Sequence, residues 1–304
     1  GTAVSGGQRM SILDMFSFPF MQRALIAGVL VSLCCALLGV SLVLKRYSMI
    51  GDGLSHVSFG ALAVAVALGF TPLYFSIPVV ILAAFFLLRM ASHPRWNSDA
   101  AIAVMSASAL ALGIIVISLT TGMTTDVDNY MFGSVLAMTK TDVVLSAGLS
   151  IAVLALFVLF YHKLFAVTFD ENFSAATGVR VSRYNTLLAI LTALTIVLGM
   201  RMMGAMLISS LVIFPALTAM RLFKSFRGVV VCSGITAVVC FCVGLTVSFV
   251  CSTPVGASVV AANLALFLLA CLTAAAETPK SNRDARRGVP VFTRLPREAE
   301  HPYI

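Results

Sequence analysis

A chain of 304 residues in which 60% of the side chains are hydrophobic and 11% are charged is too apolar for a soluble domain, where about a quarter of the residues are charged. The net charge of +8 does not indicate nucleic-acid binding, because Lys and Arg gather in a few loops and in the C-terminal tail. That distribution is typical of a membrane protein, in which loop charge sets orientation. The composition therefore predicts an integral membrane protein.

Long and continuous apolar runs favour membrane-spanning helices over a β-barrel, whose strands would alternate apolar and polar residues. The shorter run 127–139 is predicted to be re-entrant or interfacial. The fold class expected is all-α, a polytopic integral membrane protein with eight to nine transmembrane helices. The predicted spans are 24–44, 49–70, 72–89, 100–120, 143–161, 184–200, 204–220, 228–250 and 254–275.

One membrane domain between two flanking segments is the expected organisation. Residues 1–14 would be an N-terminal extension, 15–276 the transmembrane domain and 277–304 a mobile cytoplasmic tail. The loops after the first, third, fifth and seventh spans carry most of the loop Lys and Arg, whereas the alternate connections carry only Lys140 and Arg201. The positive-inside rule then places the C-terminus in the cytoplasm, and nine spans would place the N-terminus outside.

A pair of ionisable residues marks the start of the second span. Asp52 and His56 are four residues apart, so they share one face of a helix. A charged group within a bilayer costs roughly 2.5 to 3.5 kcal/mol on insertion scales, which suggests a functional reason for the pair. A carboxylate oxygen with an imidazole nitrogen suits a divalent transition metal. The alternative is that Asp52 caps the helix through its N-terminal amides while His56 packs against a neighbour.

Four segments form a recognisable pattern in chain order: Gly-Asp-x-x-Ser-His at 51–56, the Tyr-x-Phe-Gly segment at 130–137, the apolar run ending in proline at 199–215, and Thr-Pro-x-Gly-x-Ser at 253–258. In this order they resemble the membrane permeases of ATP-binding-cassette importers for zinc and manganese. The resemblance covers about residues 15–275. It implies a fold similar to cobalamin and siderophore importer permeases and a place in the cytoplasmic (inner) membrane of a prokaryote.

The resemblance also implies the function and the partners. Asp52 and His56 would coordinate zinc or manganese as it passes, with no permanently bound cofactor. A second permease copy would complete a homodimer in the lipid bilayer, an ATP-binding-cassette ATPase subunit would dock inside, and an extracellular metal-binding protein would deliver the ion. The chain itself should not be an enzyme, because it has no G-x-x-x-x-G-K-[ST] loop to cradle phosphates.

The ATPase contact is expected at the cytoplasmic turn 219–228, and the loop 169–181 is a second candidate. The residues proposed for the contact are Ala219, Met220, Arg221, Lys224 and Arg227.

Two other classes of membrane protein are alternatives to an importer permease. An ion-coupled secondary metal transporter would use Asp52 and His56 as a proton and metal relay, but the two halves of the chain show no convincing repeat. An intramembrane metalloprotease would need His-Glu-x-x-His or an equivalent ligand set, which the sequence lacks. The sequence leaves the choice between zinc and manganese open.

Overall fold

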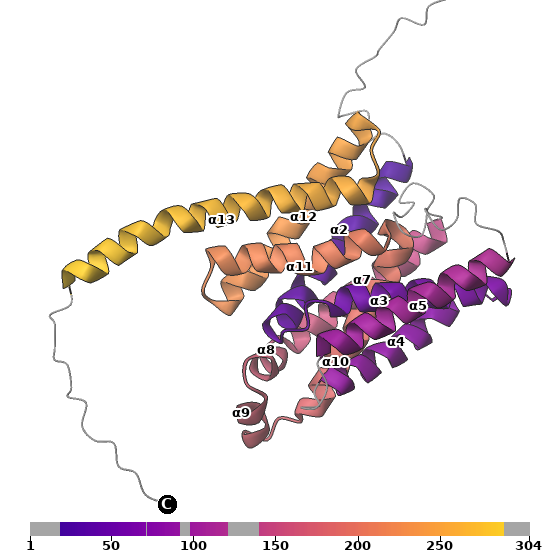
Figure 1. Cartoon of the computed structure of the whole chain (residues 1–304), viewed down its shortest axis with the longest axis horizontal. Coiled ribbons are helices and arrows are strands. Elements are labelled where there is room, and N and C mark those ends of the chain that lie inside the picture. Colours follow the sequence, from indigo (N-terminus) through magenta and orange to yellow (C-terminus); the bar gives the residue numbers. More distant parts are fainter. Residues whose placement is uncertain (1–18, 71, 92–97, 121–139, 289–304) are drawn as a thin grey trace, which may run out of the picture.

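The computed structural model describes residues 19–70, 72–91, 98–120 and 140–288, and all regular secondary structure within these ranges is helical. Figure 1 shows a bundle from which the far end of the last helix projects. The helices are α2 (Pro19–Leu44), α3 (Ile50–Ala67), α4 (Pro72–Ala91), α5 (Ser98–Thr120), α7 (Lys140–Leu159), α8 (Tyr161–Phe169), α9 (Glu171–Ala176), α10 (Val181–Met203), α11 (Ala205–Leu222), α12 (Phe226–Cys251) and α13 (Val255–Gly288).

Seven of the described helices are long and apolar enough to cross a membrane, and the pair α7 and α8, bent by 69°, makes an eighth if it forms one span. Helix α4 contains a shorter apolar stretch, Tyr74–Leu87. The predicted all-helical, multi-span fold is confirmed. The seven candidate spans are Met21–Leu44, Ile50–Ala67, Ala100–Thr120, Val181–Met200, Ala205–Leu222, Phe226–Cys251 and Val255–Thr273.

Two predicted segments fall wholly beyond these residues, and a third falls partly beyond them. The segment 127–139 and the extension 1–14 lie outside the described part of the chain. Helix α13 continues to Gly288, past the domain boundary predicted after residue 276, so the first part of the expected tail is helical. The domain boundaries stay predictions.

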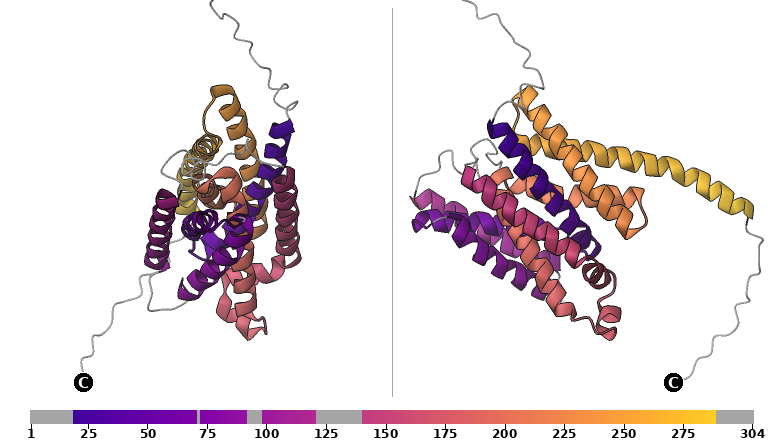
Figure 2. Two further views of the ribbon diagram at one scale, coloured as in Figure 1. Left: turned by 90° about the vertical axis from the view of Figure 1, so that its right-hand side faces the viewer. Right: turned by 180° about the vertical axis from the view of Figure 1, so that it is seen from behind.

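Helix α2 runs through the middle of the bundle and packs against α7, α10, α11 and α12 (Figure 2). Its buried face includes Cys34, Cys35 and Leu38. The approach to α11 is close because Gly39 has no side chain: a Cβ there would lie 2.1 Å from the carbonyl oxygen of Val212. The glycine therefore sets how near these two helices can come.

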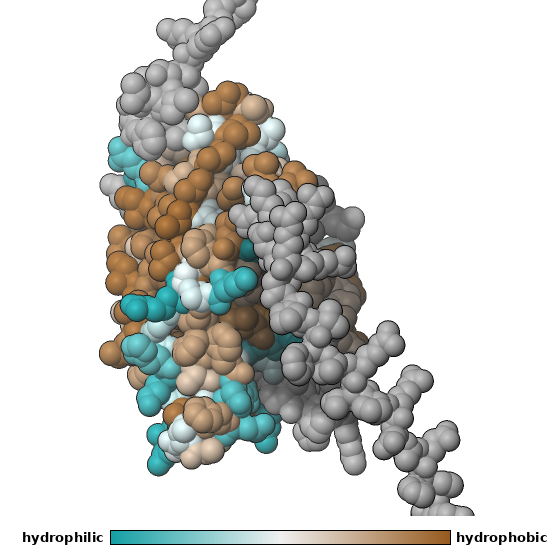
Figure 3. All heavy atoms as spheres, turned by 90° about the vertical axis from the view of Figure 1, so that its left-hand side faces the viewer, coloured by the Kyte–Doolittle hydropathy of each residue, from teal (hydrophilic) through white to brown (hydrophobic). Residues whose placement is uncertain are grey.

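The face of the molecule drawn in Figure 3 is largely apolar, with polar residues gathered toward its lower end in that view. Large apolar side chains stand exposed along α5, including Val104, Leu112 and Leu119. An exposed apolar face of this extent would be unstable in water, but it suits contact with lipid chains.

The break between α10 and α11 consists of one residue, Gly204, whose φ is 83°. Side chains on L-residues disfavour this left-handed region, and glycine occupies it without that cost. The predicted spans 184–200 and 204–220 leave a connection at 201–203, but these residues belong to α10, and the break falls on Gly204 alone. It fixes where α11, which contacts both α2 and α3, begins.

At one end of the bundle, an aromatic cluster joins α8 to the start of α12. The ring of Phe226 lies 4.8 Å from that of Phe165, 5.5 Å from that of Tyr161 and 5.9 Å from that of Phe169, measured between centroids. Helices α11 and α12 are separated only by residues 223–225. The short turn and helix α8 therefore form one continuous surface.

Candidate metal-binding site

Helix α3 carries the predicted pair in its first two turns. Its N-cap is Met49, and no side chain caps the helix, so the alternative in which Asp52 serves as the cap is not what the structure shows. Asp52 still lies in the first turn, where the helix dipole stabilises a negative charge. The carboxylate is therefore free of a capping role and available for another.

Asp52 and His56 face the same side of α3, as their spacing predicts. The His56 Nε2 and Asp52 Oδ1 atoms lie 3.7 Å apart, and the side chains are 18% and 41% exposed, respectively. That separation exceeds a hydrogen bond. It is close to the separation of about 3.4 Å between two ligands about 2.1 Å from one tetrahedral zinc ion. Small rotations would bring both atoms onto one cation.

The other ring nitrogen of His56 is also informative. Nδ1 is buried and makes no hydrogen bond with any residue that the structure describes. A buried nitrogen without a partner is costly, and such atoms mark places where an ion or water completes the contacts. The imidazole is therefore not fully satisfied by its protein surroundings.

Close packing of α5 against α3 fixes the direction in which the pair points. A Cβ on Gly60 would lie 2.7 Å from the carbonyl oxygen of Ala109, and one on Gly53 would lie 2.7 Å from the Ile102 side chain. These small residues let the two helices touch along their length. Rotation of α3 is restricted as a result, and Asp52 and His56 keep a defined orientation.

A third polar side chain meets the pair from a different helix. Ser209 of α11 lies with its Oγ 3.2 Å from Asp52 Oδ1. Sequence reasoning did not identify this residue, because a serine in an apolar helix commonly bonds to its own backbone and gives no signal of a distant partner. Among the described residues, no group of three or more His, Cys, Asp or Glu side chains gathers as a metal site.

A second polar group lies near the basic turn that precedes α3. Lys45 donates to Glu171 Oε1 of α9 at 2.7 Å and to Asn185 Oδ1 of α10 at 2.6 Å, and Asn185 donates to Glu171 at 3.1 Å. The Lys45 side chain is only 5% exposed, whereas that of Glu171 is 47% exposed. Burial raises the pKa of Glu171, but the hydrogen bonds from Lys45 and Asn185 and the Lys45 charge outweigh it, so this pKa lies below its ordinary value.

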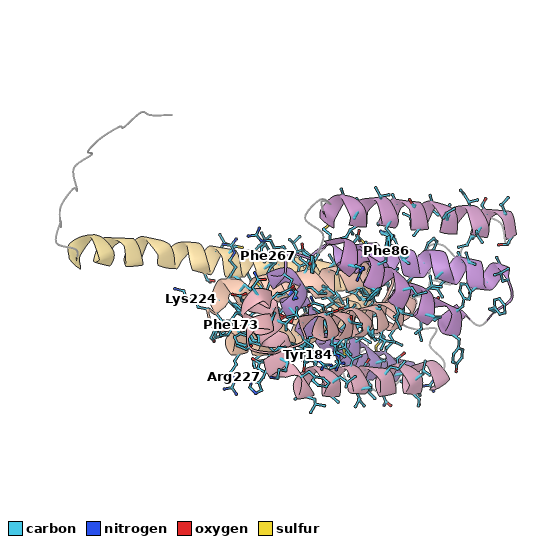
Figure 4. All side chains as sticks on the ribbon, turned by 90° about the horizontal axis from the view of Figure 1, so that it is seen from below. Phe86, Phe173, Tyr184, Lys224, Arg227 and Phe267 are labelled. Carbon is cyan, nitrogen blue, oxygen red and sulfur yellow. The ribbon has the colours of Figure 1, made fainter. Side chains whose placement is uncertain are left out.

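The residues predicted for the ATPase contact lie around the α11–α12 turn. Arg221, Lys224 and Arg227 are exposed, and Figure 4 shows Lys224 and Arg227 pointing away from the body. Met220 is partly buried, and Ala219 is fully buried. A partner at this surface would therefore meet the three basic side chains rather than Ala219.

Comparison with known proteins extends over the same membrane region. The sequence model of the ABC 3 transport family matches residues 17–274. The high-affinity zinc uptake system membrane protein ZnuB of Haemophilus influenzae is 31% identical over 252 residues, covering 83% of this chain and 97% of the relative. The manganese import system permease protein ScaB of Streptococcus gordonii is 30% identical over 258 residues, covering 85% and 92%.

Solved structures agree with the sequence relatives. PsaBC from Streptococcus pneumoniae, in complex with Fab, superposes with a TM-score of 0.77 at 30% identity, covering 86% of this chain and 95% of that one. An inward-facing structure described as a metal-chelate type ABC transporter gives a TM-score of 0.63 at 16% identity, covering 89% and 92%, and shows the shared fold alone. The family match runs through every described candidate span, and the chain belongs to the ABC 3 transport family.

Proposed function

We propose that this chain is the membrane permease subunit of an ATP-driven importer that moves zinc or manganese across the cytoplasmic membrane. The observation that carries the proposal is the Asp52–His56 pair, held on one face of a helix long and apolar enough to cross a membrane, at a separation close to that of two ligands on one ion. The kinship with ZnuB and ScaB, named for zinc uptake and manganese import, supports the same class of cargo.

Two strong ligands from one chain leave a zinc or manganese shell incomplete. Asp52 is partly exposed in the single chain, so a second copy facing it, or water, could supply the rest. An incomplete shell also suits transport, since an ion held too firmly would not leave. We therefore propose a homodimer in which two Asp52–His56 pairs face one pathway, loaded from outside by a metal-binding protein.

The energy source would be a separate ATPase, because this sequence contains no phosphate-cradling G-x-x-x-x-G-K-[ST] loop. We place its contact at the exposed basic turn, with α9 as a neighbouring candidate, since the aromatic cluster around Phe226 joins the turn to α8. Charge reversal at Arg221, Lys224 and Arg227 should then reduce metal transported per ATP hydrolysed. Unchanged coupling in that triple variant would move the contact elsewhere.

This placement uses the orientation derived from loop charge. The α11–α12 turn and the C-terminus would face the cytoplasm, and the α12–α13 turn would face outside. The alternative, an ion-coupled secondary transporter with Asp52 and His56 as a proton relay, gains no support from the family match, which is to an ABC family.

Uptake of radioactive zinc and manganese by cells carrying the complete transporter tests the proposal. Asp52→Ala and His56→Ala should each reduce uptake to background at equal membrane levels. Ser58→Ala is the matched control, because Ser58 is buried on the same helix and its hydroxyl makes no hydrogen bond with the described residues. Near-normal uptake by both Asp52→Ala and His56→Ala would refute the proposed role of the pair.

A further inference from the structure

Two adjacent serines on α11, Ser209 and Ser210, differ in whether they reach the Asp52 carboxylate. Ser209 Oγ lies 3.2 Å from Asp52 Oδ1 and 3.2 Å from the carbonyl oxygen of Ala205. Ser210 Oγ donates to the carbonyl oxygen of Leu207 at 2.9 Å and is buried. Both serines therefore have a local backbone acceptor, and only Ser209 also reaches the carboxylate on α3.

A serine hydroxyl has one hydrogen, so Ser209 cannot donate fully to both acceptors. A charged carboxylate accepts a stronger hydrogen bond than a neutral carbonyl. When the hydroxyl donates to Oδ1, that oxygen is held in place and keeps a second lone pair for the cation that it would share with His56 Nε2. The hydroxyl can instead turn to Ala205, which leaves its own oxygen directed toward the space around Asp52.

We propose that Ser209 is a positioning residue for the cation site: it orients the Asp52 carboxylate from α11 and supplies a hard oxygen that weights the site toward manganese over zinc. The inference rests on the proposed function, because it assumes that Asp52 meets the transported ion. A carboxylate and a hydroxyl are hard donors that suit manganese, whereas a thiol is a soft donor that suits zinc.

The location of Ser209 makes its replacement informative. Ser209→Ala removes the hydrogen bond and the hard oxygen, so the apparent KM should rise about five- to tenfold, more for manganese than for zinc, with little change in maximal rate. Ser209→Thr keeps a hydroxyl and should restore most of the affinity. Ser209→Cys puts sulfur next to the Asp52 carboxylate and should lower the KM for zinc relative to the KM for manganese.

Zinc and manganese uptake kinetics, measured on the complete transporter in proteoliposomes, test this assignment. Ser210→Ala and Ser210→Cys are the matched controls and should keep the wild-type KM values. A purely structural role would lower the amount of active protein, and thus the maximal rate for both metals, without moving KM. If Ser209→Ala does not assemble, the KM values of Ser209→Cys test the proposal instead. A zinc KM that falls relative to the manganese KM supports it, and an unchanged ratio of the two KM values refutes it.

Two results would overturn the proposal: a KM for Ser209→Ala within twofold of wild type for both metals, or an equal shift in Ser210→Ala. Asp52→Ala in the same assay separates this inference from the function on which it rests. If Asp52→Ala transports normally, the proposed function fails. If Asp52→Ala is inactive while the Ser209 series behaves like the Ser210 series, only the role of Ser209 is refuted.

Discussion

The contact between Lys45 and Glu171 should stabilise the bundle, and the cost of losing it should depend on which partner is removed. Lys45 lies in the turn before α3 and is almost fully buried, whereas Glu171 on α9 is about half exposed. Removing Glu171 leaves a buried ammonium whose one remaining acceptor among the described side chains is the neutral Asn185 oxygen. Removing Lys45 leaves a carboxylate that water can reach. The first change should therefore cost more than the second.

The size of the difference follows from burial. Breaking a fully buried pair by deleting one partner costs about 3 to 5 kcal/mol, and partial exposure of Glu171 lowers that to about 2 to 3 kcal/mol for Glu171→Ala. Lys45→Met keeps most of the buried aliphatic stem, so its cost should be about 1 kcal/mol or less. The double variant Lys45→Met with Glu171→Ala should resemble Lys45→Met, because no buried charge remains without its partner.

Denaturant unfolding of the purified chain in detergent, followed by tryptophan fluorescence or circular dichroism, measures these three values and the coupling between them. Arg46→Met is the control, since Arg46 is the exposed neighbour of Lys45. Equal costs for Glu171→Ala and Lys45→Met, or a coupling energy below about 0.5 kcal/mol, would refute the reasoning.

Three further predictions concern pH, packing and topology. The pKa of Glu171 in the folded chain lies below its ordinary value of 4.5. The stabilisation that the Glu171 carboxylate gives to the fold should therefore be complete above pH 4.5 and be lost as the pH falls through the pKa of the folded state. The free energy of unfolding of Lys45→Met should depend less on acid pH. Gly39→Ala should destabilise the bundle by about 3 kcal/mol in detergent unfolding because a Cβ would meet a backbone oxygen of α11, whereas Gly148→Ala, with open space around it, should be neutral or stabilising. In a cysteine-free background, an impermeant thiol reagent on intact cells should label Ser252→Cys and not Lys224→Cys, and the reverse pattern would invert the orientation.

Local patterns account for much of what could be predicted. The apolar runs locate the helices because each must satisfy its own backbone within a membrane, and the i, i+4 spacing places Asp52 and His56 on one face. Gly204 marks the α10–α11 break for a similarly local reason, its positive φ. These features depend on residues near one another in the chain.

The remaining features depend on contacts between distant residues. Ser209 meets Asp52 across 157 positions, and Lys45 meets Glu171 across 126, so no periodicity could reveal either pair. The predicted span 143–161 ends where the chain bends by 69° from α7 into α8, and the predicted loop 169–181 contains the short helix α9. Packing decides such details, because it selects which of several locally acceptable conformations buries the most surface.

The central claim is that Asp52 and His56 hold the transported ion, and electron spin-echo modulation of bound Mn²⁺ tests it most directly. The complete transporter loaded with Mn²⁺ should show coupling to an imidazole ¹⁴N nucleus. His56→Ala should abolish that coupling, and Asp52→Ala should weaken Mn²⁺ binding. A nitrogen coupling of unchanged strength in His56→Ala, or its absence from the loaded wild-type protein, would contradict the account.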